Sequence, residues 1–167
     1  MKISKRPTLL HALKQPIIAI SAAQSHLVAL AENGTVYTWG IGEYGQLCRP
    51  FFLNRLYETY CDCLPSLVIL PPNFDVAAIA GAGFSTFILG NKAGVLSCGK
   101  NGYGELGLGD EVSRTILTPI HAFEKLKIVE VVGGIHHTLF LDIYGDVWVS
   151  GKRPSLKIIR YSIGLFK

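Results

Sequence analysis

The chain has 167 residues, of which 49% are hydrophobic and 17% are charged. This composition excludes intrinsic disorder, which requires low hydrophobicity and high charge. No run of 18 uninterrupted apolar residues occurs, so a membrane-spanning helix is not expected. Residues 1–14 and 152–167 together carry nine basic and no acidic residues, whereas the middle carries seven basic against twelve acidic residues. This distribution indicates either an anionic partner near the ends or solubilising tails on an apolar body.

The four cysteines, Cys48, Cys61, Cys63 and Cys98, do not have the spacing of a zinc site, which needs paired ligands two to four residues apart. We therefore expect reduced thiols, no metal and no cofactor. The chain shows no secretory signal with a small-residue cleavage site, so we expect an intracellular protein of the nucleus or cytoplasm. Its basic N-terminus leaves a mitochondrial presequence as an alternative, although these residues fit the repeat described next.

Three segments of equal length, 18–40, 77–99 and 129–151, form an internal repeat with offsets of 59 and 52 residues. Each ends in a glycine, and each has a leucine ten residues before it. Each copy predicts one strand followed by a β-hairpin, because short runs rich in β-formers flank the turn sequences ENG, NKAG and DIYG. Three or four strands every 50–60 residues are typical of propeller blades.

A proline opens a lead-in before each copy, at Pro7, Pro65 and Pro119. The lead-ins divide the chain, as a single repeat domain, into repeat one (6–64), repeat two (65–118) and repeat three (119–152). Residues 48–64 form an insertion within repeat one. Residues 153–167 follow as a basic tail, or as a last strand that pairs with an open sheet edge.

The segments SHLVALAENGTVYTWGIGEYGQL, GKNGYGELGLGD and GGIHHTLFLDIYGDVWVSG resemble the regulator of chromosome condensation repeat. The resemblance covers roughly residues 6–152. It implies an all-β fold of propeller-like blades, each an antiparallel four-stranded sheet, with about three blades of a family ring of seven. The sequence departs from the pattern where Ser85 replaces a histidine, where Cys98 and Ser150 replace a tryptophan, and where Cys48 replaces a glycine.

Several repeat positions predict structural roles. We expect His26 and His137 to bond neighbouring backbone and hold the blade turn, because buried polar groups need partners; a ligand or catalytic role is the alternative. Trp39 and Trp148 are expected to fill space between blades. The glycines that end the three segments, Gly40, Gly99 and Gly151, complete this structural set.

No catalytic motif is recognised, so we expect no enzyme. The resemblance implies a partner face for family members that open a small GTPase, and His136 with Asp110 or Glu111 could lie on it; ordinary loop polarity is the alternative. For an anionic partner such as nucleic acid, the candidate contacts are Lys152, Arg153, Lys157 and Arg160.

Three blades leave two apolar blade faces uncovered, which is unusual for a monomer. The sequence therefore predicts a non-enzymatic interaction module that docks on a partner chain or larger assembly, such as chromatin or a ribonucleoprotein, through blade faces and basic ends. One alternative is a guanine-nucleotide exchange factor, or a fragment of one, for a small Ran-like GTPase. Others are a degenerate gene product and half of a split propeller, and self-association is a further expectation.

Overall fold

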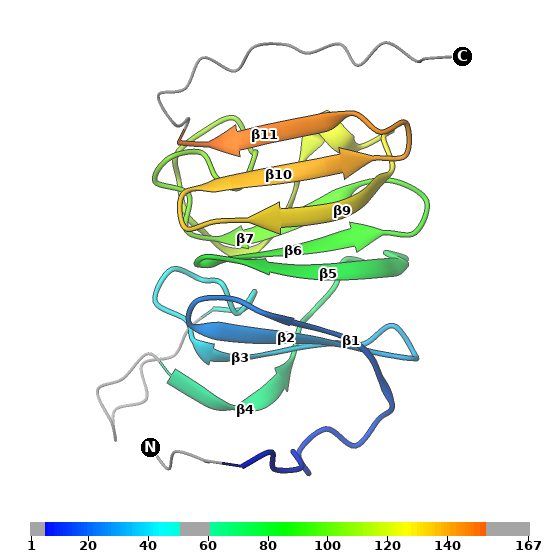
Figure 1. Cartoon of the computed structure of the whole chain (residues 1–167), viewed down its shortest axis with the longest axis vertical. Helices are drawn as coiled ribbons and strands as arrows, with labels where there is room; N and C mark the ends of the chain where they lie inside the picture. Colours follow the sequence, from blue (N-terminus) through cyan, green and yellow to red (C-terminus); the bar gives the residue numbers. More distant parts are fainter. Residues whose placement is uncertain (1–5, 51–60, 153–167) are drawn as a thin grey trace.

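The computed structural model describes residues 6–50 and 61–152, which form three antiparallel sheets stacked in chain order along the long axis (Figure 1). Sheet one has the order β1-β2-β3-β4, sheet two β5-β6-β7-β8, and sheet three β11-β10-β9. Sheet one comprises β1 (Ile17–Ala22), β2 (His26–Ala31), β3 (Val36–Ile41) and β4 (Cys61–Leu67). Sheet two comprises β5 (Val76–Ala82), β6 (Ser85–Gly90), β7 (Val95–Gly99) and β8 (Arg114–Pro119). Sheet three comprises β9 (Ile128–Gly133), β10 (His137–Asp142) and β11 (Val147–Gly151), preceded by a single turn of 3-10 helix, η1 (His121–Phe123).

These sheets confirm the predicted all-β, blade-like fold. Sheets one and two have the four expected strands, and sheet three has three within the described residues. We refer to the sheets as blades one, two and three. No helix within residues 6–50 and 61–152 is long and apolar enough to cross a membrane.

The sheets do not begin where the proline lead-ins begin. Pro65 lies inside β4, and Pro119 is the last residue of β8. Each of these lead-ins therefore starts as the outermost strand of the preceding blade, a position that tolerates proline because an edge strand leaves an N–H unpaired. The predicted tail or strand 153–167 lies outside the described residues, as does part of the insertion in repeat one.

Glycine is required at the end of each repeated segment. Gly40, Gly99 and Gly151 have φ of 114°, 112° and 97°, which L side chains rarely adopt. A Cβ at any of them would overlap the backbone oxygen of the residue just before the strand opposite, which is Ser25, Phe84 or His136. The residue after each glycine donates its N–H to that same oxygen, as Lys152 does to His136 at 2.7 Å. These contacts close the blade turn and leave no room for a side chain.

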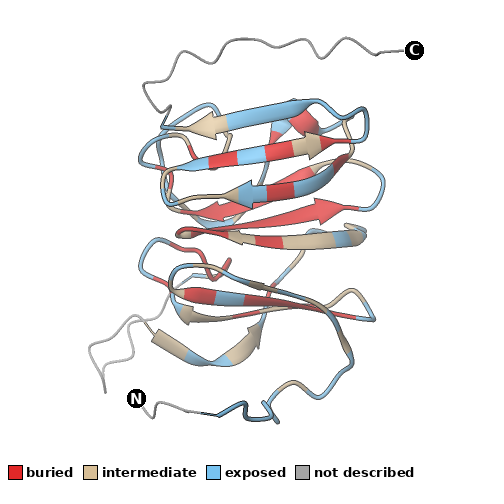
Figure 2. Ribbon diagram, viewed as in Figure 1, coloured by how far each residue is buried: buried red, intermediate tan, exposed pale blue. Residues whose placement is uncertain are grey.

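The apolar core lies in two layers, one at each junction between blades (Figure 2). The layer between blades one and two contains Val28, Leu30, Val36, Cys48, Val68, Ile88, Leu96 and Cys98. The layer between blades two and three contains Ala80, Ala82, Phe87, Leu89, Val95, Leu106, Ile120, Phe123, Ile128, Val131 and Phe140. Blade two is covered on both faces, so all six residues of β6 are buried.

Candidate interaction surfaces

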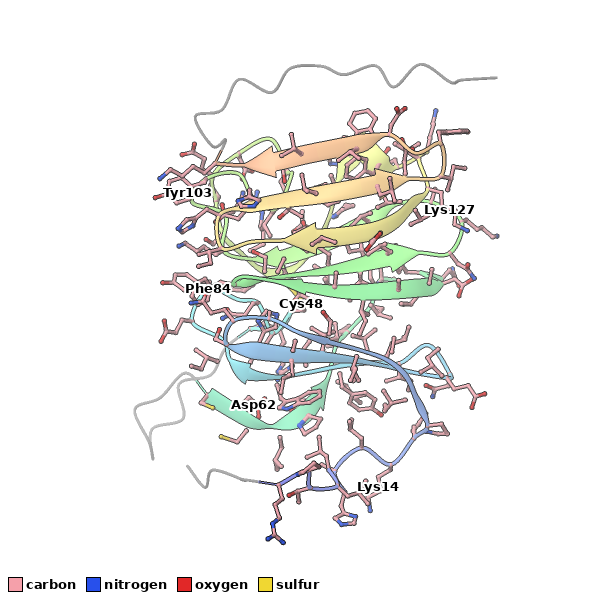
Figure 3. All side chains as sticks on the ribbon, viewed as in Figure 1. Lys14, Cys48, Asp62, Phe84, Tyr103 and Lys127 are labelled. Atoms are coloured by element: carbon pink, nitrogen blue, oxygen red, sulfur yellow. A yellow bond between two sulfur atoms is a disulfide. The ribbon has the colours of Figure 1, made fainter. Side chains whose placement is uncertain are left out.

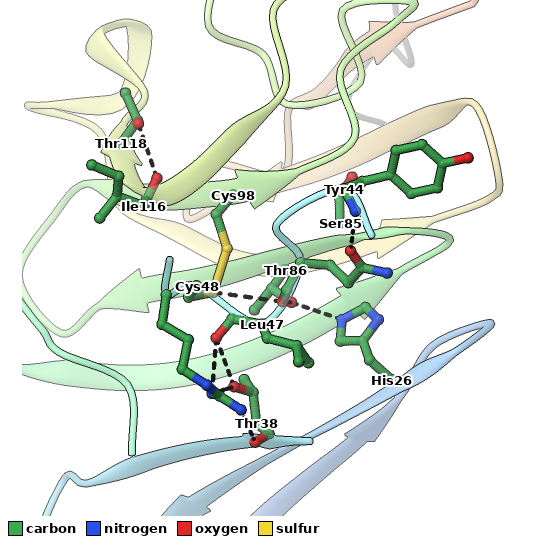
Figure 4. Close-up of a disulfide and its surroundings, with 12 residues drawn as sticks. His26, Thr38, Tyr44, Leu47, Cys48, Ser85, Thr86, Cys98, Ile116 and Thr118 are labelled. Atoms are coloured by element: carbon green, nitrogen blue, oxygen red, sulfur yellow. Dashed lines mark hydrogen bonds between the residues drawn. A yellow bond between two sulfur atoms is a disulfide. The ribbon is translucent and has the colours of Figure 1, made fainter. Parts of the chain in front are cut away.

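A chain of three polar groups joins blade one to blade two. The Thr86 hydroxyl donates to the backbone oxygen of Gln46 at 2.7 Å, and its oxygen lies 2.7 Å from His26 Nε2 (Figure 4). Because the hydroxyl proton is committed to Gln46, His26 must donate from Nε2, so its proton sits there. Burial lowers the pKa of His26 to about 4, and the ring is therefore neutral at physiological pH.

The bond of His26 differs from the one predicted from the sequence. We expected neighbouring backbone as the partner, but the ring reaches the hydroxyl of the next blade. The reason is the strand register: His26 shares with Val28 and Leu30 the face of β2 that packs on blade two.

The second junction repeats this pattern with different side chains. Thr138, which corresponds to Thr86, donates to the backbone oxygen of Glu105 at 2.9 Å. Ser150 donates to the same oxygen at 3.0 Å. Ser85 stands where His26 stands in blade one, and its shorter side chain bonds Lys100 O in its own blade at 2.9 Å. The threonine-to-loop bond therefore occurs at both junctions, whereas the histidine occurs at one.

Aromatic and basic side chains follow the loop edge of the molecule, seen at Tyr103 and Phe84 in Figure 3. We call this set the aromatic rim. At the first junction, Lys100 Nζ lies 5.4 Å from the ring of Tyr44, which packs edge-on against Phe84 at 5.3 Å between centroids. The rim consists of Tyr44, Phe84, Lys100, Tyr103, His136 and Lys152.

The second half of the rim brings together two residues predicted to bind a partner. His136 stacks edge-on against Tyr103 at 4.8 Å, and Lys152 Nζ lies 4.9 Å from the same ring. Lys152 is exposed and His136 is half-buried. Arg153, Lys157 and Arg160, the other predicted basic contacts, lie outside the described residues.

Asp110 stabilises its own loop through contacts of its carboxylate with neighbouring residues. Its carboxylate accepts from Val112 N at 2.9 Å and from Asn101 Nδ2 at 3.0 Å, and it pairs with Arg114. The Val112 hydrogen bond, followed by Arg114 and Asn101, holds the pKa of Asp110 below its usual value. Glu111, the alternative partner residue, is exposed.

One face of blade three carries apolar side chains that no described segment covers. Leu139 lies directly opposite Val132 on β9 and Val149 on β11, so these side chains share a face. They are 41%, 56% and 44% exposed. We define the third-blade face by the residues that share this side of the sheet: Glu130, Val132, His137, Leu139, Leu141, Val147 and Val149.

Of the two tryptophans predicted to fill space between blades, only Trp148 packs at a junction of the described blades. Trp148 donates from Nε1 to Asp142 Oδ2 at 3.0 Å and packs on Phe123 at 5.8 Å, at the edge of the second junction. It remains 44% exposed. The Trp148 hydrogen bond, followed by backbone N–H groups, holds the pKa of Asp142 below its usual value. Trp39 lies opposite Leu27, on the side of blade one that faces away from blade two.

The structure corrects the expectation of four reduced thiols, because Cys48 and Cys98 form a disulfide (Figure 4). Cys61 and Cys63 are free thiols with sulfur atoms 3.2 Å apart. The hydrogen bond between these two thiols, together with burial, raises the pKa of Cys61. Within the described part of the chain, no group of three or more His, Cys, Asp or Glu side chains is placed to hold a metal ion.

Sequence reasoning missed the two loop carbonyls and the two threonines that reach them. The signal was present, since Thr86 and Thr138 occupy the same place in their repeats, as do Gln46 and Glu105. A threonine in a strand reads as an ordinary β-former. Its role emerges only when the next blade is in place.

Comparison with known proteins gives one consistent result. The sequence profile described as "Regulator of chromosome condensation (RCC1) repeat" matches residues 33–89 and 92–141, and a second profile of the same description matches 17–46. The chain is 30% identical over 146 residues to the human probable E3 ubiquitin-protein ligase HERC3, covering 87% of this chain and 13% of that protein. It is 34% identical over 152 residues to the mouse serine/threonine-protein kinase Nek9, covering 83% of this chain and 15% of that protein.

Solved structures agree on the fold. Prp20p from Saccharomyces cerevisiae superposes with a TM-score of 0.71 at 26% identity, over 87% of this chain and 32% of that one. Its structure was described together with its binding to Gsp1p and histones. Human WBSCR16 superposes with a TM-score of 0.64 at 20% identity, over 81% of this chain and 34% of that one. The chain thus spans about a third of these solved relatives, and 13% and 15% of HERC3 and Nek9.

Proposed function

This chain belongs to the regulator of chromosome condensation (RCC1) repeat family, and from that premise we propose that it is a non-enzymatic protein-interaction module. It docks a partner protein or larger assembly on the third-blade face, with the aromatic rim beside it. From its membership of this repeat family we also propose a location inside the cell, in the nucleus or cytoplasm.

The observation that carries this proposal is the contrast between repeat-equivalent positions. Val36 in blade one and Val95 in blade two are 0% and 1% exposed, whereas Val147 in blade three is 65% exposed. Burying a valine or leucine fully stabilises by about 1.5–3 kcal/mol, so covering three half-exposed side chains would contribute a few kcal/mol. That gain favours a docked partner, as one contribution beside the polar contacts of the rim.

The rim adds polarity to this apolar face. Lys152 is exposed beside Tyr103 and His136, and such cations at the border of an apolar patch steer partners of opposite charge. We therefore propose a partner with an apolar patch and acidic groups on the side that meets Lys152, because the face itself carries the exposed Glu130. For an anionic assembly we propose contacts between the basic ends and nucleic acid, with a steep salt dependence as their signature.

The test is a quantitative pull-down of cell proteins by the full chain, read by mass spectrometry. Val147→Asp places a charge on the third-blade face, and Ile116→Asp is its matched control, because Val147 and Ile116 are 65% and 63% exposed on strands. A partner that is lost with Val147→Asp and kept with Ile116→Asp supports the proposal. Enrichment of the same proteins by both variants, or of none by the wild-type chain, contradicts it.

A second candidate is guanine-nucleotide exchange on a small Ran-like GTPase. It is favoured by the likeness to Prp20p, whose reported binding includes Gsp1p, and by the position of His136 on the rim. Release of a fluorescent guanine nucleotide from such a GTPase would be followed with increasing amounts of the chain. Acceleration that His136→Ala abolishes would favour exchange, and an unchanged release rate would exclude it.

A further inference from the structure

Two departures from the repeat meet at one place in the fold. Cys48 stands where the second repeat has Gly107, and Cys98 stands where the other repeats have Trp39 and Ser150. The two cysteines are 50 residues apart in sequence, yet their Cα atoms lie 5.7 Å apart and their sulfurs are bonded. This Cα separation is within the usual range for a disulfide. The pair therefore replaces two unrelated residues of the repeat with one covalent link.

Cys48 has a backbone conformation that favours glycine, so the presence of a side chain there needs a reason. Its φ is 57°, and Gly107 at the equivalent position has φ of 74°. Glycine adopts this left-handed region freely, whereas residues with a Cβ are disfavoured there. A cysteine at this position therefore carries a backbone cost that glycine avoids. Its compensation is a contact that glycine cannot make, and the structure contains one, the bond to Cys98.

The link lies beside the polar chain that joins the same two blades. Cys98 on β7 lies directly opposite Thr86 on β6, and Cys48 follows Gln46 by two residues. The disulfide and the His26–Thr86–Gln46 chain thus tie the same loop of blade one to the same strands of blade two (Figure 4).

The second junction shows the non-covalent version of this link. Gly107 takes the place of Cys48, and the hydroxyl of Ser150, in the place of Cys98, donates to Glu105 O at 3.0 Å. A blade junction of this chain can therefore be built with no cystine at all. The cystine is an addition specific to the first junction.

We propose that Cys48 and Cys98 form a redox-controlled lock that fixes blade one to blade two. The lock closes by exchange with a small-molecule disulfide such as glutathione disulfide. One cysteine thiolate attacks that disulfide and releases one thiolate; the second cysteine then attacks the mixed disulfide and releases the other. Two protein thiols become one cystine, and one small disulfide becomes two thiols. This inference does not rest on the docking function proposed above.

Burial determines how the lock responds. Cys48 and Cys98 are 2% and 0% exposed, so reagents reach them only when the junction opens. Exchange is therefore slow in the folded chain and fast in denaturant. Cys61 and Cys63 lie at the surface of β4 and react first, so they must be replaced before the response of the buried pair is measured.

The experiment uses the full chain carrying Cys61→Ser and Cys63→Ser, equilibrated with glutathione disulfide or with dithiothreitol. Peptide mapping after alkylation reports the cystine, and thermal unfolding reports its effect. From the chain entropy of a loop of about 50 residues, we expect the oxidised chain to melt about 10 °C higher. Hydrogen exchange should slow in residues 26–31 of blade one and change little in residues 137–142 of blade three.

The matched control copies the second junction onto the first. Cys48→Gly with Cys98→Ser recreates the pair Gly107 and Ser150, so this variant should fold and melt at one temperature under both conditions. Absence of the 48–98 cystine after refolding in glutathione disulfide overturns the proposal. A cystine that forms but leaves the melting temperature and the exchange of residues 26–31 unchanged overturns it equally.

Discussion

The hydroxyl of Thr86 should contribute more to stability than that of its counterpart in the next blade. Replacing Thr86 with valine keeps the shape of the side chain and removes the group that both accepts from His26 and donates to Gln46. All three residues are at most 2% exposed. Water therefore cannot replace the lost partners without opening the junction.

The expected loss of stability follows from the polar groups that the substitution leaves without a hydrogen-bond partner. His26 Nε2 and the Gln46 oxygen each lose their partner, and an unsatisfied buried group costs about 1–3 kcal/mol. We expect Thr86→Val to lower the free energy of unfolding by about 2–4 kcal/mol. Thr138→Val removes one donor only, and Glu105 O keeps its bond from Ser150, so its cost should be about 1 kcal/mol.

Urea unfolding of both variants, followed by circular dichroism, measures this difference. The chain supplies the control, because Thr86 and Thr138 are equivalent in the repeat and equally buried, at 0% and 1% exposed. Equal losses, or a larger loss for Thr138→Val, would show that the two bonds to His26 and Gln46 do not add to the stability of the first junction.

Three further results are expected. First, stability should fall by about 3 kcal/mol as pH drops from 6.5 to 4, because His26 has a folded pKa of about 4 against an ordinary 6.5 and the unfolded chain binds the extra proton in that window. His26→Gln should weaken this dependence in melts followed at several pH values. Second, Gly99→Ala should cost more than 2 kcal/mol in urea unfolding, because the new Cβ overlaps Phe84 O at a φ of 112°. Third, Gly94→Ala should cost about 1 kcal/mol, because φ is 87° but nothing lies within 4 Å; a similar loss at both glycines would argue against the overlap.

The hairpins of this fold could be predicted because their residues repeat. Val36, Val95 and Val147 each open the second strand of a hairpin, as the equal spacing indicated. The outermost strands β4 and β8 could not be assigned, because proline within them reads as a break in strand pattern. A strand at the edge of a blade tolerates proline, but the sequence alone does not show which strand will lie at the edge.

The interaction surfaces were harder to predict, for a different reason. His136 was assigned to a partner face by the family resemblance and Lys152 by its charge, but Tyr103, the ring that joins them, was not among the predicted partner residues. The cystine was also hidden, because four cysteines allow several pairings and nothing in the sequence brings positions 48 and 98 together. Contacts between blades depend on how one sheet is placed on the next, which a local pattern does not contain.

The two junctions indicate which parts of the repeat hold one blade on the next. The bond from a strand threonine to a loop carbonyl is present at both, through Thr86 and Thr138. Around it the chemistry varies: His26 and a cystine supplement it at the first junction, and Ser150 at the second. The threonine bond is therefore the shared element, and the supplements set the strength of each junction separately. It follows that blade one can be loosened from blade two, by reduction or by acid, while blade three stays in place.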